Sequence, residues 1–166
     1  MANIRQWMVA GGIIENNGHL LLVENLRRNG HTDWSTPGGV VEFGEDAVAG
    51  LTREVTEETG LLVTQWQGPI YRVSTTAADM GWHMEVEVHR ALAWTGEVAI
   101  GNDPDGIVVN AKFCDGALAA EHLADTAQWV REPMLSWLAE RWTDTQTFRY
   151  ELRGADRSSA KVSRLH

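Results

Sequence analysis

Residues 39–61 read GVVEFGEDAVAGLTREVTEETGL, and this stretch decides the fold. Within it, apolar side chains recur at the i, i+3 and i+7 spacing of one helix stripe, at Val48, Leu51 and Val55. We therefore expect a helix over residues 46–59 that buries this stripe. The residue that follows the helix segment is a glycine, which favours the left-handed conformation in which many helices end.

Three glutamates, Glu54, Glu57 and Glu58, lie in the second half of the expected helix. At 100° per residue they share one face, centred about 100° from the apolar stripe. Acids four residues apart repel each other by about 0.2–0.5 kcal/mol per pair, and the C-terminal end of a helix disfavours negative charge. Acids that stay together against both effects indicate a counter-ion, and Mg²⁺ or Mn²⁺ suits their hard oxygen atoms. A solvated acidic face is the competing interpretation.

The spacing around these acids favours the ion-binding interpretation. Gly39 is followed after five residues by Glu45, and after seven more by the run Arg53-Glu54-Val55-Thr56-Glu57-Glu58-Thr59-Gly60-Leu61. This spacing matches every position of G-x5-E-x7-R-E-U-x-E-E-x-G-U, where U is aliphatic, and the chain resembles the Nudix hydrolase family with its MutT-like members. The resemblance implies an α/β/α sandwich built on a central mixed β-sheet. It also implies metal-dependent hydrolysis of a nucleoside diphosphate linked to another moiety.

The same resemblance implies a role for each acid of the helix. Glu54, Glu57 and Glu58 would bind the divalent metal, Mg²⁺ or Mn²⁺, together with the backbone carbonyl of Gly38. Bound cations neutralise phosphate oxygens, lower the pKa of bound water and orient it for in-line displacement. Glu57 or Glu58 would serve as the general base, and an acid outside the motif is left open as an alternative.

Neighbouring residues complete the expected site. Arg53 would pair with Glu45 and hold the preceding loop on the helix, so the resemblance counts both among the catalytic residues. Gly39 would let the backbone approach metal and phosphate closely. Arg27 and Arg28, in the loop before the motif, would bind the distal phosphates, because guanidinium groups contact phosphate in a bidentate manner.

Four acids outside the motif are candidates for an additional ligand or base. Asp103 and Asp105 lie in a loop before an expected strand, where some members of the family supply another acidic ligand. Glu85 and Glu87 lie on a long expected strand. The alternative for each of the four is an exposed acid without a role.

Composition and charge exclude several classes of protein. The chain has 166 residues, of which 43% are hydrophobic, and a formal charge of −9. An acidic body disfavours a nucleic acid polymer as partner but not a small nucleotide that arrives with divalent cations. No apolar run approaches the roughly 20 residues of a membrane helix, and residues 1–14 make a poor signal peptide. The single cysteine, Cys114, excludes an intramolecular disulfide framework. We expect a cytoplasmic protein without membrane contact.

The rest of the chain predicts a mixture of strands and helices without a strict βαβ repeat, which favours a mixed sheet with helices on both faces. We expect strands at residues 7–15, 19–24, 40–41, 61–66, 70–76, 82–94 and 107–113, and helices at 117–123 and from Pro133, in a first turn, to about Trp142. Residues 1–150 are expected to form a single Nudix hydrolase domain. Residues 151–166, with four basic and two acidic side chains, are expected to form a flexible basic C-terminal tail.

Several functions remain open at this point. The first is a housecleaning pyrophosphohydrolase that acts on a nucleoside triphosphate or another nucleoside diphosphate derivative. The second is an ADP-ribose or dinucleotide pyrophosphatase, although residues 75–79 lack the proline or tyrosine that some such subfamilies carry past the motif. The third is a catalytically silent nucleotide-binding module, against which the intact acids argue. A homodimer, with the tail folded on the partner, is a further open prediction.

Overall fold

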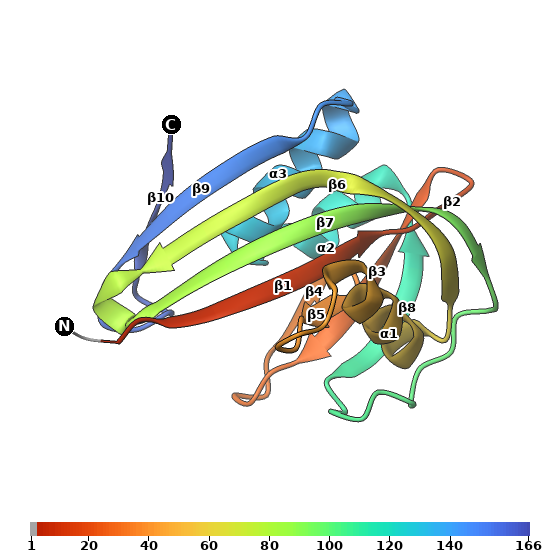
Figure 1. Cartoon of the computed structure of the whole chain (residues 1–166), viewed down its shortest axis with the longest axis horizontal. Helices are drawn as coiled ribbons and strands as arrows, with labels where there is room; N and C mark the ends of the chain where they lie inside the picture. The colour runs from red at the N-terminus through yellow and green to blue at the C-terminus, as the bar shows by residue number, and fades with distance from the viewer. Residues whose placement is uncertain (1–2) are drawn as a thin grey trace.

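The computed structural model describes residues 3–166, and Met1 and Ala2 lie outside the described part (Figure 1). The strands are β1 (Arg5–Ile13), β2 (Glu15–Asn16), β3 (His19–Leu26), β4 (Thr32–Ser35), β5 (Gly38–Val40), β6 (Leu62–Ala77), β7 (Trp82–Thr95), β8 (Val108–Cys114), β9 (Gln146–Arg153) and β10 (Lys161–Leu165). The helices are α1 (Ala47–Thr59), α2 (Gly116–Leu123) and α3 (Gln128–Glu140), with a 3-10 turn, η1 (Ala78–Met80).

The strands form two sheets. The larger sheet has the order β10-β9-β6-β7-β1-β5, and a smaller one contains β2, β3, β4 and β8. The larger sheet is mixed, because β1 with β7 and β6 with β9 pair in parallel while its other neighbours are antiparallel. Figure 1 shows α1 on one side of the large sheet and α2 and α3 on the other. The expected α/β sandwich around a mixed central sheet is confirmed.

Helix α1 begins and ends as its sequence predicts. The Asp46 side chain accepts a hydrogen bond from the Ala49 amide at 3.2 Å and so caps the N-terminus. Gly60, at φ 77°, ends the helix in the left-handed region. Leu51 and Val55 are fully buried in an apolar cluster shared with β1 and β6. The buried stripe fixes the rotation of α1 about its axis, and with it the direction of the acidic face.

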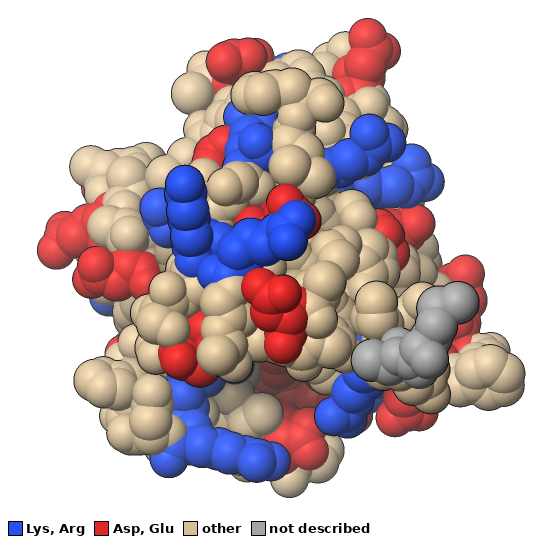
Figure 2. Space-filling view, turned by 90° about the vertical axis from the view of Figure 1, so that its left-hand side faces the viewer, with Lys and Arg blue, Asp and Glu red and all other residues tan. Residues whose placement is uncertain are grey.

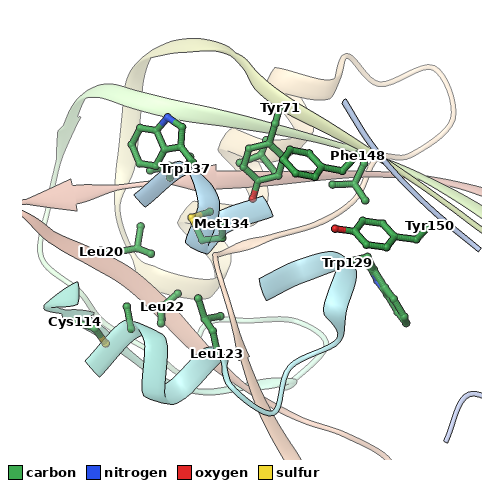
Figure 3. Packing of buried hydrophobic residues seen from close by; sticks show 14 of the residues in the cluster. Leu20, Leu22, Tyr71, Cys114, Leu123, Trp129, Met134, Trp137, Phe148 and Tyr150 are labelled. Carbon is green, nitrogen blue, oxygen red and sulfur yellow. The ribbon is translucent and has the colours of Figure 1, made fainter. Parts of the chain in front are cut away.

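A second and larger apolar cluster lies between the central sheet and helices α2 and α3. It includes the ten residues labelled in Figure 3, which are Leu20, Leu22, Tyr71, Cys114, Leu123, Trp129, Met134, Trp137, Phe148 and Tyr150. The two clusters together cover both faces of the sheet, so the strands between them are rigid supports for side chains at their ends and edges.

The prediction of a flexible tail over residues 151–166 is wrong. Phe148, Tyr150 and Leu152 are buried at alternate positions of β9, which is the pattern of a strand with one covered face. Strand β10 then pairs antiparallel with β9, from Lys161 opposite Arg153 onward. A domain boundary at residue 150 would cut β9 in the middle, so the C-terminal residues belong to the fold.

The last helix also differs from the prediction. Helix α3 begins at Gln128, and Pro133 is its sixth residue rather than part of its first turn. A proline inside a helix removes one backbone hydrogen bond, but here its ring is buried, which offsets part of that cost. The two strands expected over 61–76 form the single strand β6, whose pairing is irregular between Gln67 and Tyr71. Within residues 3–166, no helix has the length and apolarity to cross a membrane.

Candidate active site

A cavity of about 620 Å³ opens beside the acidic face of α1. Its lining includes buried apolar side chains of the sheet, α2 and α3, namely Tyr71, Val73, Val88, Leu123, Trp129 and Met134. The lining also includes charged side chains, namely Arg27, Glu42, Glu54, Glu58, Asp103, Asp105 and Arg157. Figure 2 views the end of the molecule that carries the N-terminus and shows acidic and basic side chains around a hollow in the lower part of this face.

Two glycines bring the backbone of β5 between β1 and α1. A Cβ atom at Gly38, where φ is +155°, would collide with the backbone oxygen of Ala10. A Cβ atom at Gly39 would lie 2.6 Å from the carboxyl carbon of Glu54. At Gly38 the clash is with fixed backbone, so only glycine fits there, whereas at Gly39 the Glu54 carboxylate would have to move. Both residues line the cavity. The expected close approach of the backbone to the site therefore has a structural cause.

Arg53 is the centre of an ion-pair network on α1. Its Nε and Nη2 donate to Glu45 Oε2 and Oε1 at 3.1 and 3.2 Å, so the expected Arg53–Glu45 pair is confirmed. Its Nη1 also lies 3.1 Å from Glu54 Oε1 and 3.3 Å from Glu57 Oε2. The hydrogen bonds from Arg53 lower the pKa of Glu45, and those to Glu45 raise the pKa of Arg53. Arg53 thus ties the loop before α1 to two acids of the helix.

Glu58 is the most buried acid of the motif, with 7% of its surface exposed. Burial raises the pKa of Glu58 to about 8, and the neighbouring charge of Glu54 adds to the effect. The Gly38 amide, which donates to Glu58 Oε2 at 3.4 Å, acts in the opposite direction. Burial likewise raises the pKa of Glu54, although Arg53 opposes the shift. The charge of Asp103 contributes to the raised pKa of both glutamates.

The donor set fits a hard divalent cation. Glu54, Glu58 and Asp103 all line the cavity, and a bound cation would relieve the repulsion between their negative charges. Glu57 does not line it, and its carboxylate contacts Arg53 instead. Among residues 3–166, no three His, Cys, Asp or Glu side chains are already arranged to hold an ion. Arg53 occupies the position between two of the carboxylates that would have to converge.

Asp103 and Asp105 both line the cavity, although they lie more than forty residues after the acids of α1, and the charge of Asp103 acts on Glu54 and Glu58. The Asp103 carboxylate accepts hydrogen bonds from the amides of Asp105, Ile107 and Val108 at 3.0–3.1 Å. These bonds fix the loop before β8. The structure therefore brings both candidate acids to the site.

Glu85 and Glu87 lie on the opposite face of β7 from the cavity. Val86, between them, lines the cavity, and alternate residues of a strand point to opposite faces. Glu85 Oε1 lies 2.7 Å from His83 Nε2, and Glu87 Oε1 lies 3.5 Å from the Nε of Arg72. Neither acid is placed to act as ligand or base.

The two arginines expected to bind phosphate, Arg27 and Arg28, differ in their position relative to the cavity. Arg27 lines the cavity, and its Nε and Nη2 each donate to Asp33 at 2.8 Å. Asn25, also in the lining, donates to the Asp33 carboxylate at 3.2 Å and to Ser35 Oγ at 2.9 Å. Arg28 is exposed and is not part of the lining. Only Arg27 is therefore brought to the site.

Asn25, Trp129 and Arg157 are among the lining residues that sequence reasoning missed. The misplaced start of α3 hid Trp129, which lies in the first turn of that helix. Arg157 lies in the segment that was expected to be an unstructured tail. The alternating apolar residues of β9 were the signal that this segment folds.

Comparisons with known proteins agree with the fold and the motif. The Nudix domain model matches residues 5–138. A MutT-like protein of Streptomyces ambofaciens is 44% identical over 55 residues, which are 33% of this chain and 34% of that protein. The match thus spans about a third of that curated relative.

Two solved structures have a similar fold. The E. coli ORF135 protein has a TM-score of 0.67 at 20% identity, over 85% of this chain and 96% of that one. A MutT Nudix hydrolase from Burkholderia pseudomallei has a TM-score of 0.61 at 22% identity, over 82% of this chain and 98% of that one. Because the domain model covers most of the chain, the protein belongs to the Nudix family.

Proposed function

We propose that the protein is a divalent-metal-dependent pyrophosphohydrolase that acts on a nucleoside triphosphate or another nucleoside diphosphate derivative. The observation that carries the proposal is that Glu54, Glu58 and Asp103 line the same cavity as a set of buried apolar side chains. The acids suit a cation that binds phosphates, and the apolar side chains suit a nucleobase. Membership of the Nudix family supports the same reaction.

Each residue of the site has a distinct part in this proposal. Glu54, Glu58 and Asp103 would hold Mg²⁺ or Mn²⁺, with the Gly38 carbonyl as the backbone ligand implied by the family resemblance. Glu57 joins them only if its carboxylate leaves Arg53. Such a cation supplies neutralisation of the phosphate oxygens and an activated water.

The general base in this proposal is Glu57 or Glu58, and the position of Glu58 in the cavity makes Glu58 the better candidate. Its Oε2 accepts the Gly38 amide and its side chain lines the cavity, whereas the Glu57 carboxylate contacts Arg53 instead. Arg53, held by Glu45, keeps α1 and the preceding loop in register. The buried walls formed by Trp129 and neighbouring apolar side chains exclude water from the substrate.

A substrate screen tests the proposal. Canonical, oxidised and sugar-linked nucleotides are incubated with Mg²⁺ or Mn²⁺, and release of pyrophosphate or a monophosphate is measured. We expect turnover that EDTA abolishes, and Glu58→Gln should lower kcat at least about 10²-fold. Glu121→Gln, at an exposed position of α2, is the matched control and should keep wild-type rates. Turnover of no phosphoanhydride would support the silent binding module instead.

The same screen separates the alternative substrates. Preference for ADP-ribose or a dinucleotide over triphosphates would favour the second candidate function. We also propose that the ligand is a small-molecule nucleotide rather than a nucleic acid polymer. We further propose that the protein is cytoplasmic and does not bind a membrane. A homodimer stays a prediction that sedimentation can test.

A further inference from the structure

The loop between β9 and β10, residues 154–160, reaches the cavity from outside the region that the family model matches. That region ends at residue 138, whereas Arg157 of the loop is among the lining residues. Figure 1 shows this end of β9 and β10 beside the end of the sheet that carries the N-terminus. The C-terminal strands therefore add a wall, and a cation, to the candidate site.

The loop is held in one conformation by its own polar groups. The Asp156 carboxylate accepts hydrogen bonds from both the backbone amides and the hydroxyls of Ser158 and Ser159, at 2.6–3.0 Å. These donors lower the pKa of Asp156 to about 2. The Gly154 amide donates to Asp79 Oδ2 at 3.0 Å and ties the loop to η1. A residue presented by such a loop is positioned before a ligand arrives, which reduces the entropy lost on binding.

Arg157 is directed over the cavity wall rather than toward a carboxylate. Its guanidinium carbon lies 5.2 Å from the centre of the Trp129 ring, and Trp129 is buried in the lining. Arg157 is exposed as a whole residue, but desolvation of its guanidinium and the charge of Arg27 lower its pKa, while the charge of Asp33 opposes the shift, so both side chains are near it. Among residues 3–166, the ion pairs include Arg27 with Asp33 but none that involves Arg157.

The guanidinium groups of Arg27 and Arg157 make this side of the cavity suited to an anionic ligand. Two guanidinium groups share one carboxylate, that of Asp33, which leaves one positive charge without a partner. The acids Glu54 and Glu58 line the same cavity and suit a cation. A chain of phosphates satisfies both, since it binds a cation through one part and guanidinium groups through another.

We propose that Arg157 is a substrate-binding residue that, with Arg27, binds the terminal phosphate of a nucleoside triphosphate. The inference rests on the proposed function and narrows it to the class of triphosphates. Substrates with only two phosphates between their organic groups lack the free terminal phosphate that this pair contacts. Arg157 then contributes to binding and specificity, and the hydrolytic step belongs to the acids of α1.

Binding of inorganic triphosphate tests this role without requiring turnover. Arg157→Met removes the charge but keeps an unbranched side chain over Trp129, and Arg157→Lys keeps the charge without the planar fork. Arg153→Met is the matched control, because Arg153 is exposed on β9, pairs with Glu151 and does not line the cavity. Calorimetric titration with inorganic triphosphate and Mg²⁺ is carried out on all four proteins, with the Tm of each recorded.

We expect Arg157→Met to raise the Kd for inorganic triphosphate about 10- to 100-fold, as for the loss of a charged hydrogen-bonding partner. Arg157→Lys should recover part of the affinity, and Arg153→Met should match the wild type. With nucleotides, Arg157→Met should raise KM for triphosphates and leave both kcat and KM for two-phosphate substrates within about threefold.

Two results would overturn the inference. One is an unchanged Kd for inorganic triphosphate in Arg157→Met, and the other is an equal loss of triphosphate and two-phosphate substrates. If the wild type hydrolyses nucleotides while either result is obtained, only the role of Arg157 is wrong. If the wild type hydrolyses no phosphoanhydride but binds inorganic triphosphate through Arg157, the proposed hydrolysis fails and the binding role stands. If Arg157→Met does not fold, Arg157→Gln, which also removes the charge, is titrated in its place, and an unchanged Kd for inorganic triphosphate in that variant overturns the inference.

Discussion

Glu58→Gln should stabilise the metal-free protein, and the gain should depend on pH. In the folded chain the Glu58 carboxyl has a pKa raised to about 8, against 4.5 for the unperturbed group, chiefly because it is buried. Glutamine has nearly the same shape, carries no ionisable proton and keeps an oxygen that can accept the Gly38 amide. The substitution therefore removes the titration with little change in packing.

The sign and size follow from proton linkage. Below pH 4.5 both folded and unfolded chains hold the Glu58 proton, so the group does not affect stability. As the pH rises toward 8, the unfolded chain releases the proton while the folded chain keeps it, and the folded state loses about 1.4 kcal/mol per pH unit. The loss is about 3 kcal/mol at pH 7 and reaches at most about 5 kcal/mol above pH 8.

Thermal unfolding in EDTA measures the effect. For a chain of this size, about 3 kcal/mol corresponds to a rise in Tm of roughly 6–12 °C for Glu58→Gln at pH 7, with little change near pH 4.5. Glu121→Gln, at an exposed position of α2, controls for loss of a negative charge and should leave Tm unchanged. A Tm difference between Glu58→Gln and wild type that is the same at pH 5 and pH 8 would refute the reasoning, because it would show that the burial cost is not electrostatic.

The remaining predictions concern the backbone passage and the C-terminal strands. Gly38→Ala should destabilise the fold by several kcal/mol, on the order of the larger strain costs, because its Cβ meets the backbone of Ala10; chemical denaturation measures this. Gly39→Ala should fold but lower kcat, because its Cβ meets the movable carboxylate of Glu54, and wild-type kinetics would contradict that contact. Phe148→Ala should cost about 3–5 kcal/mol if β9 belongs to the core, and Thr147→Ala on its exposed face should cost little; equal losses would argue against that packing.

Local patterns predicted α1 and the first half of the sheet because each element carries its own signal. Leu51 and Val55 show the helical period, and Gly60 ends the helix where it is expected. The Arg53–Glu45 pair was also predictable, since the motif spacing and the resemblance both place these residues together. These features depend on neighbours within about fifteen residues, which a sequence pattern can capture.

Features that depend on distant packing were not predictable in the same way. Pro133 is tolerated inside α3 because its ring is buried, and no local pattern records that burial. Arg157 reaches Trp129 only because β9 and β10 extend the sheet, so its place in the lining follows from topology rather than from spacing. The charge of the last residues suggested a tail, and charge alone says nothing about strand pairing.

For the acidic face of α1, the sequence pattern predicts which acids are neighbours but not the surroundings of each one. Helix geometry correctly puts Glu54, Glu57 and Glu58 on one face, but that face spans about 100°, from −60° to +40° around Glu54. The cavity takes Glu58 and Glu54, while Arg53, fastened to Glu45, takes Glu57. Angular position along a helix therefore predicts which acids are neighbours. Their separate surroundings are a buried cavity for Glu58, which raises its pKa, and the Arg53 guanidinium for Glu57, and only the packed structure supplies them.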